Sequence, residues 1–234
     1  MTIFVSYAFW RLRLWAAAAI MITPTQSLAQ PSDSSPPGVF RVQPKSYAYK
    51  PRNSQNPASL IVLLHGASGD ARSFIEEFRR EADARRIVLL SVQSAGRTWA
   101  VRKPREDDQD VIDIKAAIEG LAATTPIDME RVTVMGFSDG ASYALSVGMA
   151  YPNLFRTVVA FSPGYAFAPQ RLDTDQRIFI AHSRRDPILP ADNTRQIVKE
   201  LQRAGLSPDV HWFNGGHEID PQMKQAGIDF ALRP

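Results

Sequence analysis

The sequence predicts an α/β fold, in which helices cover both faces of one mostly parallel sheet of about eight strands. Short apolar runs rich in β-branched residues alternate with longer segments of helical periodicity. These runs are apolar at nearly every position, which is typical of strands buried on both faces. No internal repeat and no change of composition divides residues 39–234, so we expect them to form a single three-layer domain.

The expected strands begin with a short pair. Val39–Val42 and Ser46–Tyr49 are separated by Gln43-Pro44-Lys45, which predicts a hairpin at the edge of the sheet. The solid apolar runs are then expected to be the remaining strands: Leu60–Leu64, Ile87–Ser91, Val132–Met135, Thr157–Phe161, Ile178–Ala181 and Val210–Phe213.

Segments of helical periodicity lie between these runs. Apolar side chains recur three and four residues apart, as the buried face of a helix requires. Gly205 is a typical C-terminal stop, and Asp220-Pro221 is a typical helix start. The expected helices are Arg72–Arg85, Asp110–Leu121, Asp139–Tyr151, Ala191–Ala204 and Asp220–Leu232.

Residues 1–29 are expected to be a signal peptide rather than part of the fold. Arg11 and Arg13 precede the apolar run Leu14–Ile22, and Ser27-Leu28-Ala29 fits a cleavage site. The alternative is a retained membrane anchor, but a membrane span needs about 20 apolar residues and this run is much shorter. Residues 30–38 are expected to be a Pro/Ser-rich linker. We therefore expect an exported protein, periplasmic or secreted, with no stable membrane insertion after cleavage.

The composition excludes several classes of protein. The net charge of +3 over 234 residues is too small, and the charges too scattered, to predict nucleic-acid binding. The signal peptide carries two of the 27 basic residues, so the excess over the 24 acidic residues falls to about +1 after cleavage. The chain has no cysteine, which excludes disulfides, thiolate metal sites and a cysteine nucleophile. No metal or cofactor is expected, and the sequence does not indicate an oligomeric state.

A candidate nucleophile lies where a strand meets a helix. Gly136-Phe137-Ser138-Asp139-Gly140 follows a predicted strand and opens an alanine-rich helix, which is the setting of a nucleophile elbow. The tight turn requires very small residues two positions on either side of the serine. It also leaves the backbone N–H of Asp139 beside the reacting centre.

A serine nucleophile needs a base, and the base needs a carboxylate that orients it. His217 lies in a glycine-rich loop after the last predicted strand, where it is free to reach a site above the sheet. Asp186 follows the preceding strand, whereas its rival Asp192 is better explained as a helix cap. The order Ser138, Asp186, His217 places all three at carboxyl ends of strands. The other histidines end a strand or lie within one: His65, His182 and His211.

Acyl transfer also requires hydrogen-bond donors for the oxyanion. His65-Gly66-Ala67-Ser68-Gly69-Asp70 follows the first long predicted strand, and Gly66 allows a close approach of the backbone. The expected donors are the backbone N–H groups of Ala67 and Asp139.

With these motifs the chain resembles the α/β-hydrolase superfamily over residues 39–232. Within it, the chain is similar to small serine esterases of the carboxylesterase/phospholipase, feruloyl esterase and polyhydroxybutyrate depolymerase types. The resemblance is carried by LLHGASGD, DMERVTVMGFSDG, HSRRDPILP and GGHEI. It implies a triad of Ser138, Asp186 and His217, with the oxyanion held after His65. Two features depart from the family: HSRRD replaces a small glycine-containing loop, and Asp139 stands where Gln, Asn or Met is more usual.

The connection Ser162–Gln176 is too short to hold the helical lid that many members of the superfamily insert there. An open site is therefore expected, with no large lid domain. His65, Trp99 and Tyr165 are candidate substrate-binding residues in the loops around it, although ordinary packing explains the two aromatic residues equally well. Arg184 and Arg185 are best explained as part of a solvated loop.

The function expected from these residues is hydrolysis of carboxylic esters, on small or polymeric substrates, through an acyl-enzyme. The alternatives are thioester or peptide hydrolysis, hydroxynitrile-type lyase chemistry on the same triad, and a non-catalytic binding module. Metal-dependent hydrolysis is not supported, because His217-Glu218 does not continue into the H-E-x-x-H pattern.

Overall fold

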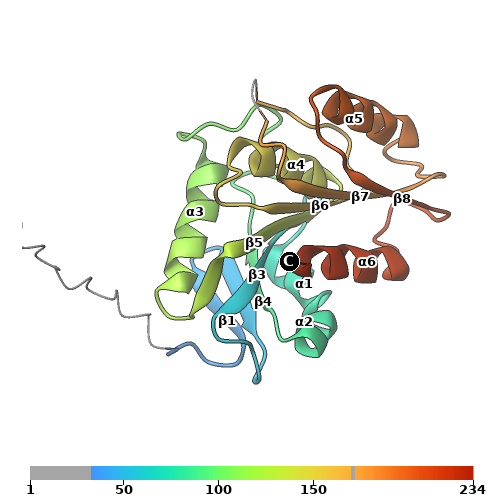
Figure 1. Cartoon of the computed structure of the whole chain (residues 1–234). Coiled ribbons are helices and arrows are strands. Elements are labelled where there is room, and N and C mark those ends of the chain that lie inside the picture. Colours follow the sequence, from blue (N-terminus) through green and yellow to red (C-terminus); the bar gives the residue numbers. More distant parts are fainter. Residues whose placement is uncertain (1–32, 170–171, 234) are drawn as a thin grey trace, which may run out of the picture. The chain divides into compact units, whose positions relative to one another are not determined.

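The computed structural model describes residues 33–169 and 172–233, and the predicted signal peptide lies outside these ranges. One eight-stranded sheet lies between two layers of helices (Figure 1). The strands are β1 Gly38–Gln43, β2 Ser46–Lys50, β3 Ala58–Leu64, β4 Val88–Val92, β5 Ile127–Phe137, β6 Thr157–Phe161, β7 Arg177–Ser183 and β8 Asp209–Phe213. The helices are α1 Ala71–Glu76, α2 Arg79–Arg85, α3 Gln109–Ala122, α4 Asp139–Ala150, α5 Ala191–Arg203 and α6 Pro221–Leu232.

The strands follow the order β1-β2-β4-β3-β5-β6-β7-β8 across the sheet. β1 and β2 form the predicted edge hairpin, and β2 pairs with β4 in antiparallel orientation. Every further pair, from β4–β3 to β7–β8, is parallel. The expected three-layer α/β fold with about eight strands is therefore confirmed.

The solid apolar runs are explained by burial on both faces of the sheet, because successive side chains of a strand point to opposite faces. In β3, Leu60, Val62 and Leu64 pack into the core under α3, α4 and α5. The residues between them, Ile61 and Leu63, pack into the second core, under α1, α2 and α6. Two hydrophobic cores thus hold the sheet from either side.

One expected helix is divided in two. The periodicity predicted a continuous helix over Arg72–Arg85, but α1 ends at Glu76 and α2 begins at Arg79. Phe78 lies at the break, where its ring is 1% exposed and packs edge-on against Phe74 with 5.3 Å between the ring centroids. Packing of these rings into the core under the sheet accompanies the break between α1 and α2, a tertiary effect that helical spacing does not contain.

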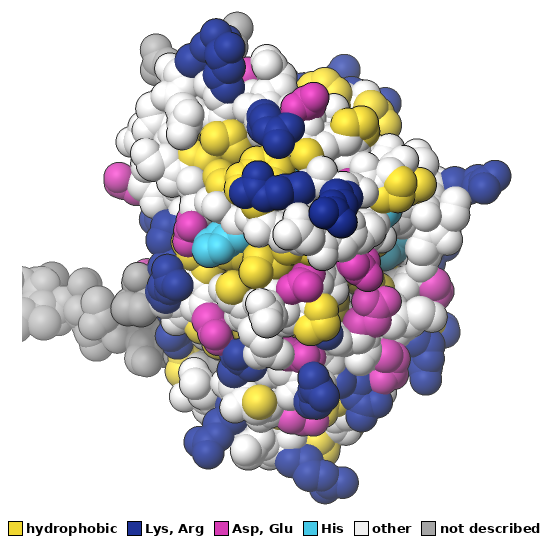
Figure 2. Space-filling model, turned by 90° about the vertical axis from the view of Figure 1, so that its right-hand side faces the viewer, with side chains coloured by type: hydrophobic (Ala, Val, Ile, Leu, Met, Phe, Trp, Pro, Cys, Tyr) yellow, Lys and Arg dark blue, Asp and Glu magenta, His cyan; other side chains and the backbone are white. Residues whose placement is uncertain are grey.

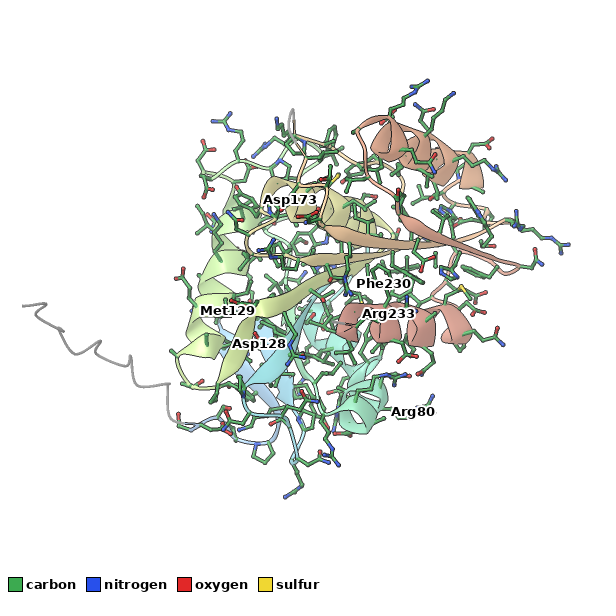
Figure 3. The ribbon with its side chains drawn as sticks, viewed as in Figure 1. Arg80, Asp128, Met129, Asp173, Phe230 and Arg233 are labelled. Atoms are coloured by element: carbon green, nitrogen blue, oxygen red, sulfur yellow. The ribbon has the colours of Figure 1, made fainter. Side chains whose placement is uncertain are left out.

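The carboxyl ends of the parallel strands lie together along one side of the sheet. We call this side the carboxyl-terminal edge, as distinct from the edge formed by the outer hairpin. The strands start on the opposite side, where Asp128 and Met129 mark the beginning of β5 (Figure 3). The connection from β6 to β7 contains no helix within its described residues, so the fold has no lid there, as predicted. The carboxyl-terminal edge is therefore open.

The described part of the predicted linker is attached to the domain. The N–H groups of Ser34 and Ser35 both donate to the carbonyl of Thr124, and Lys50 pairs with Asp33. Within the described ranges, no helix is long and apolar enough to cross a membrane.

Candidate active site

Ser138 occupies a strained turn between β5 and α4. Its φ of 57° and ψ of −118° lie in a region that L residues rarely adopt. Its N–H donates to the carbonyl of Phe161, at the end of β6, over 2.8 Å. The turn lies at the carboxyl edge of the sheet and holds the Ser138 side chain beside the loop that carries His217.

The glycines on either side of Ser138 are required by close backbone contacts. A Cβ added to Gly136 would lie 2.1 Å from the carbonyl oxygen of Gly140. A Cβ added to Gly140 would lie 2.1 Å from the carbonyl oxygen of Leu64, so the first turn of α4 packs directly on the end of β3. These contacts explain the glycine spacing in the sequence.

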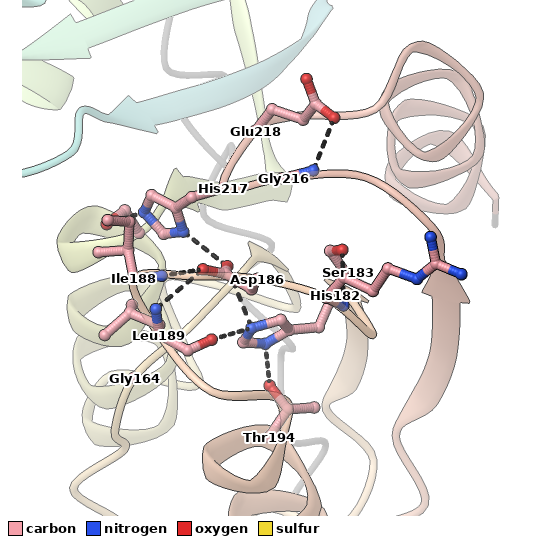
Figure 4. A network of polar contacts seen from close by, with 12 residues as sticks. Gly164, His182, Ser183, Asp186, Ile188, Leu189, Thr194, Gly216, His217 and Glu218 are labelled. Carbon is pink, nitrogen blue, oxygen red and sulfur yellow. Dashed lines mark hydrogen bonds and ion pairs between the residues drawn. The ribbon is translucent and has the colours of Figure 1, made fainter.

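Ser138, His217 and Asp186 form a continuous chain of hydrogen bonds. The Oγ of Ser138 lies 2.8 Å from Nε2 of His217. Nδ1 of His217 lies 2.6 Å from Oδ2 of Asp186 (Figure 4). With Asp186 ionised, Nδ1 of His217 donates to it, and Nε2 is left to accept the Ser138 proton. This arrangement is the geometry that a general base needs beside a serine hydroxyl.

The acid loop, Asp186–Leu189, holds Asp186 ionised. Burial of Asp186 raises its pKa, but hydrogen bonds from His217 and from the N–H groups of Ile188 and Leu189 lower it. Both of those N–H groups lie 2.8 Å from Oδ1 of Asp186. The net effect is a pKa below the ordinary carboxyl value.

Two residues next to this hydrogen-bonded chain, His182 and Ser183, were not identified from the sequence as part of the site. Nε2 of His182, a fully buried residue, lies 2.9 Å from the carbonyl of Leu189 and 3.3 Å from Asp186, while its Nδ1 lies 2.6 Å from Thr194 (Figure 4). Burial lowers the pKa of His182, which keeps the ring neutral. The one signal in the sequence was a histidine at a strand end, four residues before Asp186.

Ser183 ties the acid loop to the histidine loop. Its Oγ donates to the carbonyl of Gly215 over 2.5 Å and accepts hydrogen bonds from the N–H groups of Gly215 and Arg185, each over 3.1 Å. Gly215 lies two residues before His217, so this buried hydroxyl fixes the histidine loop relative to β7. Ser183 belongs to the segment HSRRD, which replaces the glycine-containing loop of the family. This replacement therefore supplies the hydroxyl that binds the histidine loop.

The two expected oxyanion donors belong to two segments that both approach Ser138, the loop after β3 and the start of α4. Ala67 is exposed in the loop after β3, and within the described residues its N–H donates to no other group. The N–H of Asp139 belongs to the first turn of α4, where helix N–H groups have no partner within the helix. A Cβ added to Gly66 would lie 3.5 Å from Cβ of Ser138, so the two segments meet beside Ser138.

Two of the expected substrate-binding side chains lie beneath the surface instead. His65 is 1% exposed, and its Nδ1 donates to the carbonyl of Gly66 over 2.7 Å while its Nε2 accepts from the N–H of Ser94 over 3.1 Å. Trp99 is also 1% exposed and stacks on Tyr143. Packing and hydrogen bonds within the protein hold both side chains, and His65 also lines the groove beside His217.

Tyr165 is half-buried in the β6–β7 connection, where its hydroxyl donates to Oδ1 of Asp139 over 3.2 Å. Burial, with the charge of Asp139, raises the pKa of Tyr165, so it remains a neutral donor. The same connection is anchored to α4 through Ser142, whose Oγ accepts from the N–H of Gly164 over 2.8 Å. Tyr165 is thus held rigidly beside the elbow, and its partial exposure is compatible with the expected contact with substrate.

A groove of about 550 Å³ opens beside His217 and the loop after β3. Phe74, Phe137 and Ile219 supply its apolar surface, and its polar side chains include the carboxylates of Asp70, Glu77 and Glu218. Figure 2 shows the face at which the chain passes from β8 to α6, where acidic side chains gather across the middle and hydrophobic ones lie above them.

Arg184 is exposed, and its guanidinium lies over the ring of Trp212, 5.4 Å from its centroid.

The chain belongs to the phospholipase/carboxylesterase family of α/β-hydrolases, whose model matches residues 97–231. This membership confirms the predicted resemblance and supports an esterase or related hydrolase. The matched segment includes Ser138, Asp186 and His217, and leaves Ala67 outside it.

Individual relatives agree with the family. The chain is 31% identical over 120 residues to an acetylxylan esterase of Coprinopsis cinerea. The matched region is 47% of this chain and 32% of that protein. It is 25% identical to esterase YpfH of Escherichia coli over 58% of this chain and 62% of that protein. A carboxylesterase of Bacillus cereus has the same fold, with a TM-score of 0.62, 20% identity, and coverage of 79% of this chain and 92% of that one.

Proposed function

We propose that the protein is a serine hydrolase that cleaves carboxylic esters through an acyl-enzyme. The observation that carries this proposal is the hydrogen-bonded chain Ser138–His217–Asp186, with distances of 2.8 and 2.6 Å, next to the N–H groups of Ala67 and Asp139. Family membership supplies the esterase class, and the geometry supports a role for each residue.

The mechanism follows from these contacts. Ser138 attacks the ester carbonyl carbon while Nε2 of His217 takes its proton, and Asp186 stabilises the imidazolium that forms. The N–H groups of Ala67 and Asp139 donate to the oxyanion of the tetrahedral intermediate. His217 then protonates the departing alcohol, and a water molecule releases the acid by the same steps in reverse order.

The absence of a lid over the described part of the site supports a substrate that approaches from open solvent. The groove beside His217 is wide enough for a small ester and does not close around its far end. Small esters and ester groups of polymers both fit this arrangement. The enzyme names of the relatives, acetylxylan esterase among them, support the same class of substrates.

The test of the mechanism is the substitution Ser138→Ala. We expect kcat on p-nitrophenyl acetate to fall roughly 10⁴- to 10⁶-fold, because the nucleophile is lost, with little change in the free energy of unfolding. A fluorophosphonate probe should label the wild-type protein and not the variant. Ser207→Ala, on an exposed loop before β8, is the matched control and should keep full labelling. Wild-type turnover by Ser138→Ala would disprove the mechanism.

We further propose that the protein is exported and that a signal peptidase cleaves it after Ala29. The proposal is supported by the charge and hydropathy pattern of residues 1–29 alone. N-terminal sequencing of the protein recovered from the periplasm or medium should begin at Gln30. Recovery of the full-length chain with cell membranes would instead indicate a retained anchor.

A further inference from the structure

The two proposed oxyanion donors belong to segments that are far apart in the sequence. Ala67 lies in the loop after β3, and Asp139 begins α4. An oxyanion hole works when its donors are fixed before the reaction at the spacing of the transition state. Displacements of about 1 Å can reduce rates by two orders of magnitude, so the structure must hold these two segments together.

Trp99, from a third segment, donates a hydrogen bond to each of the other two. Its backbone N–H lies 2.8 Å from Oδ2 of Asp139. Its indole Nε1–H lies 2.8 Å from the carbonyl oxygen of His65, two residues before Ala67. One residue therefore connects the nucleophile elbow to the loop after β3 directly.

The surroundings make this connection rigid. The indole ring of Trp99 stacks on Tyr143 of α4, with 5.2 Å between centroids and an interplanar angle of 15°. Because Trp99 is 1% exposed, water cannot readily replace either hydrogen bond if it is lost. The His65 ring, 5.3 Å from the indole, donates in turn to the carbonyl of Gly66, next to Ala67.

We propose that Trp99 is a positioning residue for the oxyanion hole: through His65 and Asp139 it fixes the spacing of the Ala67 and Asp139 N–H donors. This inference rests on the proposed function. It also gives a role to Asp139, the residue that departs from the family pattern, because its carboxylate accepts the Trp99 N–H on one oxygen and the Tyr165 hydroxyl on the other.

The test compares the ester substrate with a trifluoromethyl ketone. Ser138 Oγ bonds to the ketone carbon, its proton passes to His217, and the carbonyl π electrons move onto the oxygen, which becomes an oxyanion. The inhibition constant of the ketone therefore reports on the oxyanion hole, whereas KM of the ester reports mainly on the ground state when acylation is slow relative to substrate dissociation. Rates are expressed per site labelled by a fluorophosphonate, so that unfolded protein is not counted.

Trp99→Phe keeps an aromatic ring and the backbone N–H but removes the indole N–H. We expect kcat to fall about 10- to 100-fold and the inhibition constant to rise by a comparable factor, with KM within about twofold of wild type. Substitution of Trp99 by β-(3-benzothienyl)alanine, which has the shape of tryptophan without the N–H, should give the same pattern even if the phenylalanine variant folds poorly.

Trp212→Phe is the matched control, because within the described residues its indole N–H has no acceptor, and it should keep wild-type constants. Wild-type kcat and inhibition constant in both Trp99 variants would overturn the inference, as would a lower melting temperature with both constants unchanged. A failure of the proposed function would be recognised by different results. In that case Ser138→Ala would keep its turnover, or the wild-type protein would not react with the fluorophosphonate.

Discussion

The residues that support the candidate site act through a few buried hydrogen bonds. Ser183 is fully buried, and its hydroxyl connects the acid loop to Gly215, two residues before His217. His182 holds the far end of the acid loop through the carbonyl of Leu189. Neither side chain contacts the Oγ of Ser138. Both, however, hold in place the acid loop and the histidine loop, which together form the hydrogen-bonded chain from Asp186 to Ser138.

Ser183→Ala should therefore lower kcat about tenfold and leave KM nearly unchanged, because the histidine loop loses its anchor. Loss of a buried hydrogen-bond partner should also lower the free energy of unfolding by about 1–3 kcal/mol. Steady-state kinetics and urea denaturation measure the two effects. Ser91→Ala is the matched control, since the Ser91 hydroxyl is equally buried but has no partner among the described residues. Equal effects in the two variants would contradict a positioning role for Ser183.

At the scale of elements, the site depends on how closely α4 approaches β3. Gly140 allows the first turn of α4 to rest on the carbonyl groups of Leu64 and His65, where a Cβ would lie 2.1 and 2.4 Å away. That contact brings the Asp139 N–H to the edge of the sheet on which Ala67 lies. A helix that began even slightly farther out would separate the two expected donors.

Gly140→Ala should consequently lower the free energy of unfolding by roughly 3 kcal/mol, because backbone atoms must move to admit the methyl group. Gly216→Ala is the matched comparison, since nothing lies within 4 Å of a Cβ at that position. It should change stability by less than about 0.5 kcal/mol. Chemical denaturation of both variants checks the contrast, and a tolerated alanine at position 140 would show that the helix can shift without cost.

At the scale of the whole molecule, three buried groups make the fold sensitive to acid. Burial lowers the pKa of His65 and of His182 below the ordinary value of 6.5, so both stay neutral in the folded protein. The pKa of Asp186 also lies below its ordinary value of 3.8; burial opposes the shift, and hydrogen bonds outweigh it. In each case the unfolded chain binds a proton at a higher pH than the folded protein does.

The contribution of the two histidines to stability is therefore fully present above about pH 6.5 and is lost as the pH falls toward their folded pKa values. Asp186 adds a further loss below about pH 4. Urea denaturation between pH 7.5 and 5 should show a falling free energy of unfolding, with a smaller slope in His182→Gln. A variant with the wild-type slope would show that His182 does not contribute to this pH dependence.

Much of the fold could be predicted from the sequence because its signals are local. The solid apolar runs identified six strands, two short segments around Gln43-Pro44-Lys45 identified the edge hairpin, and the short connection after Phe161 indicated an open site. The division of the expected helix at Phe78 could not be predicted, because it accompanies ring packing against Phe74 and the sheet. Helical periodicity does not contain that contact.

The sequence by itself determined the candidate nucleophile, base and acid, since each follows a strand of a parallel sheet and such sheets bring their carboxyl ends together. The tertiary structure alone decided what holds them. His182, Ser183 and Trp99 act through hydrogen bonds to carbonyl or carboxylate oxygens of other loops, and no local pattern encodes which loops will meet. For the same reason the sequence did not show that Trp99 would be buried: a tryptophan in a loop can face the solvent or the core, and this one packs against Tyr143.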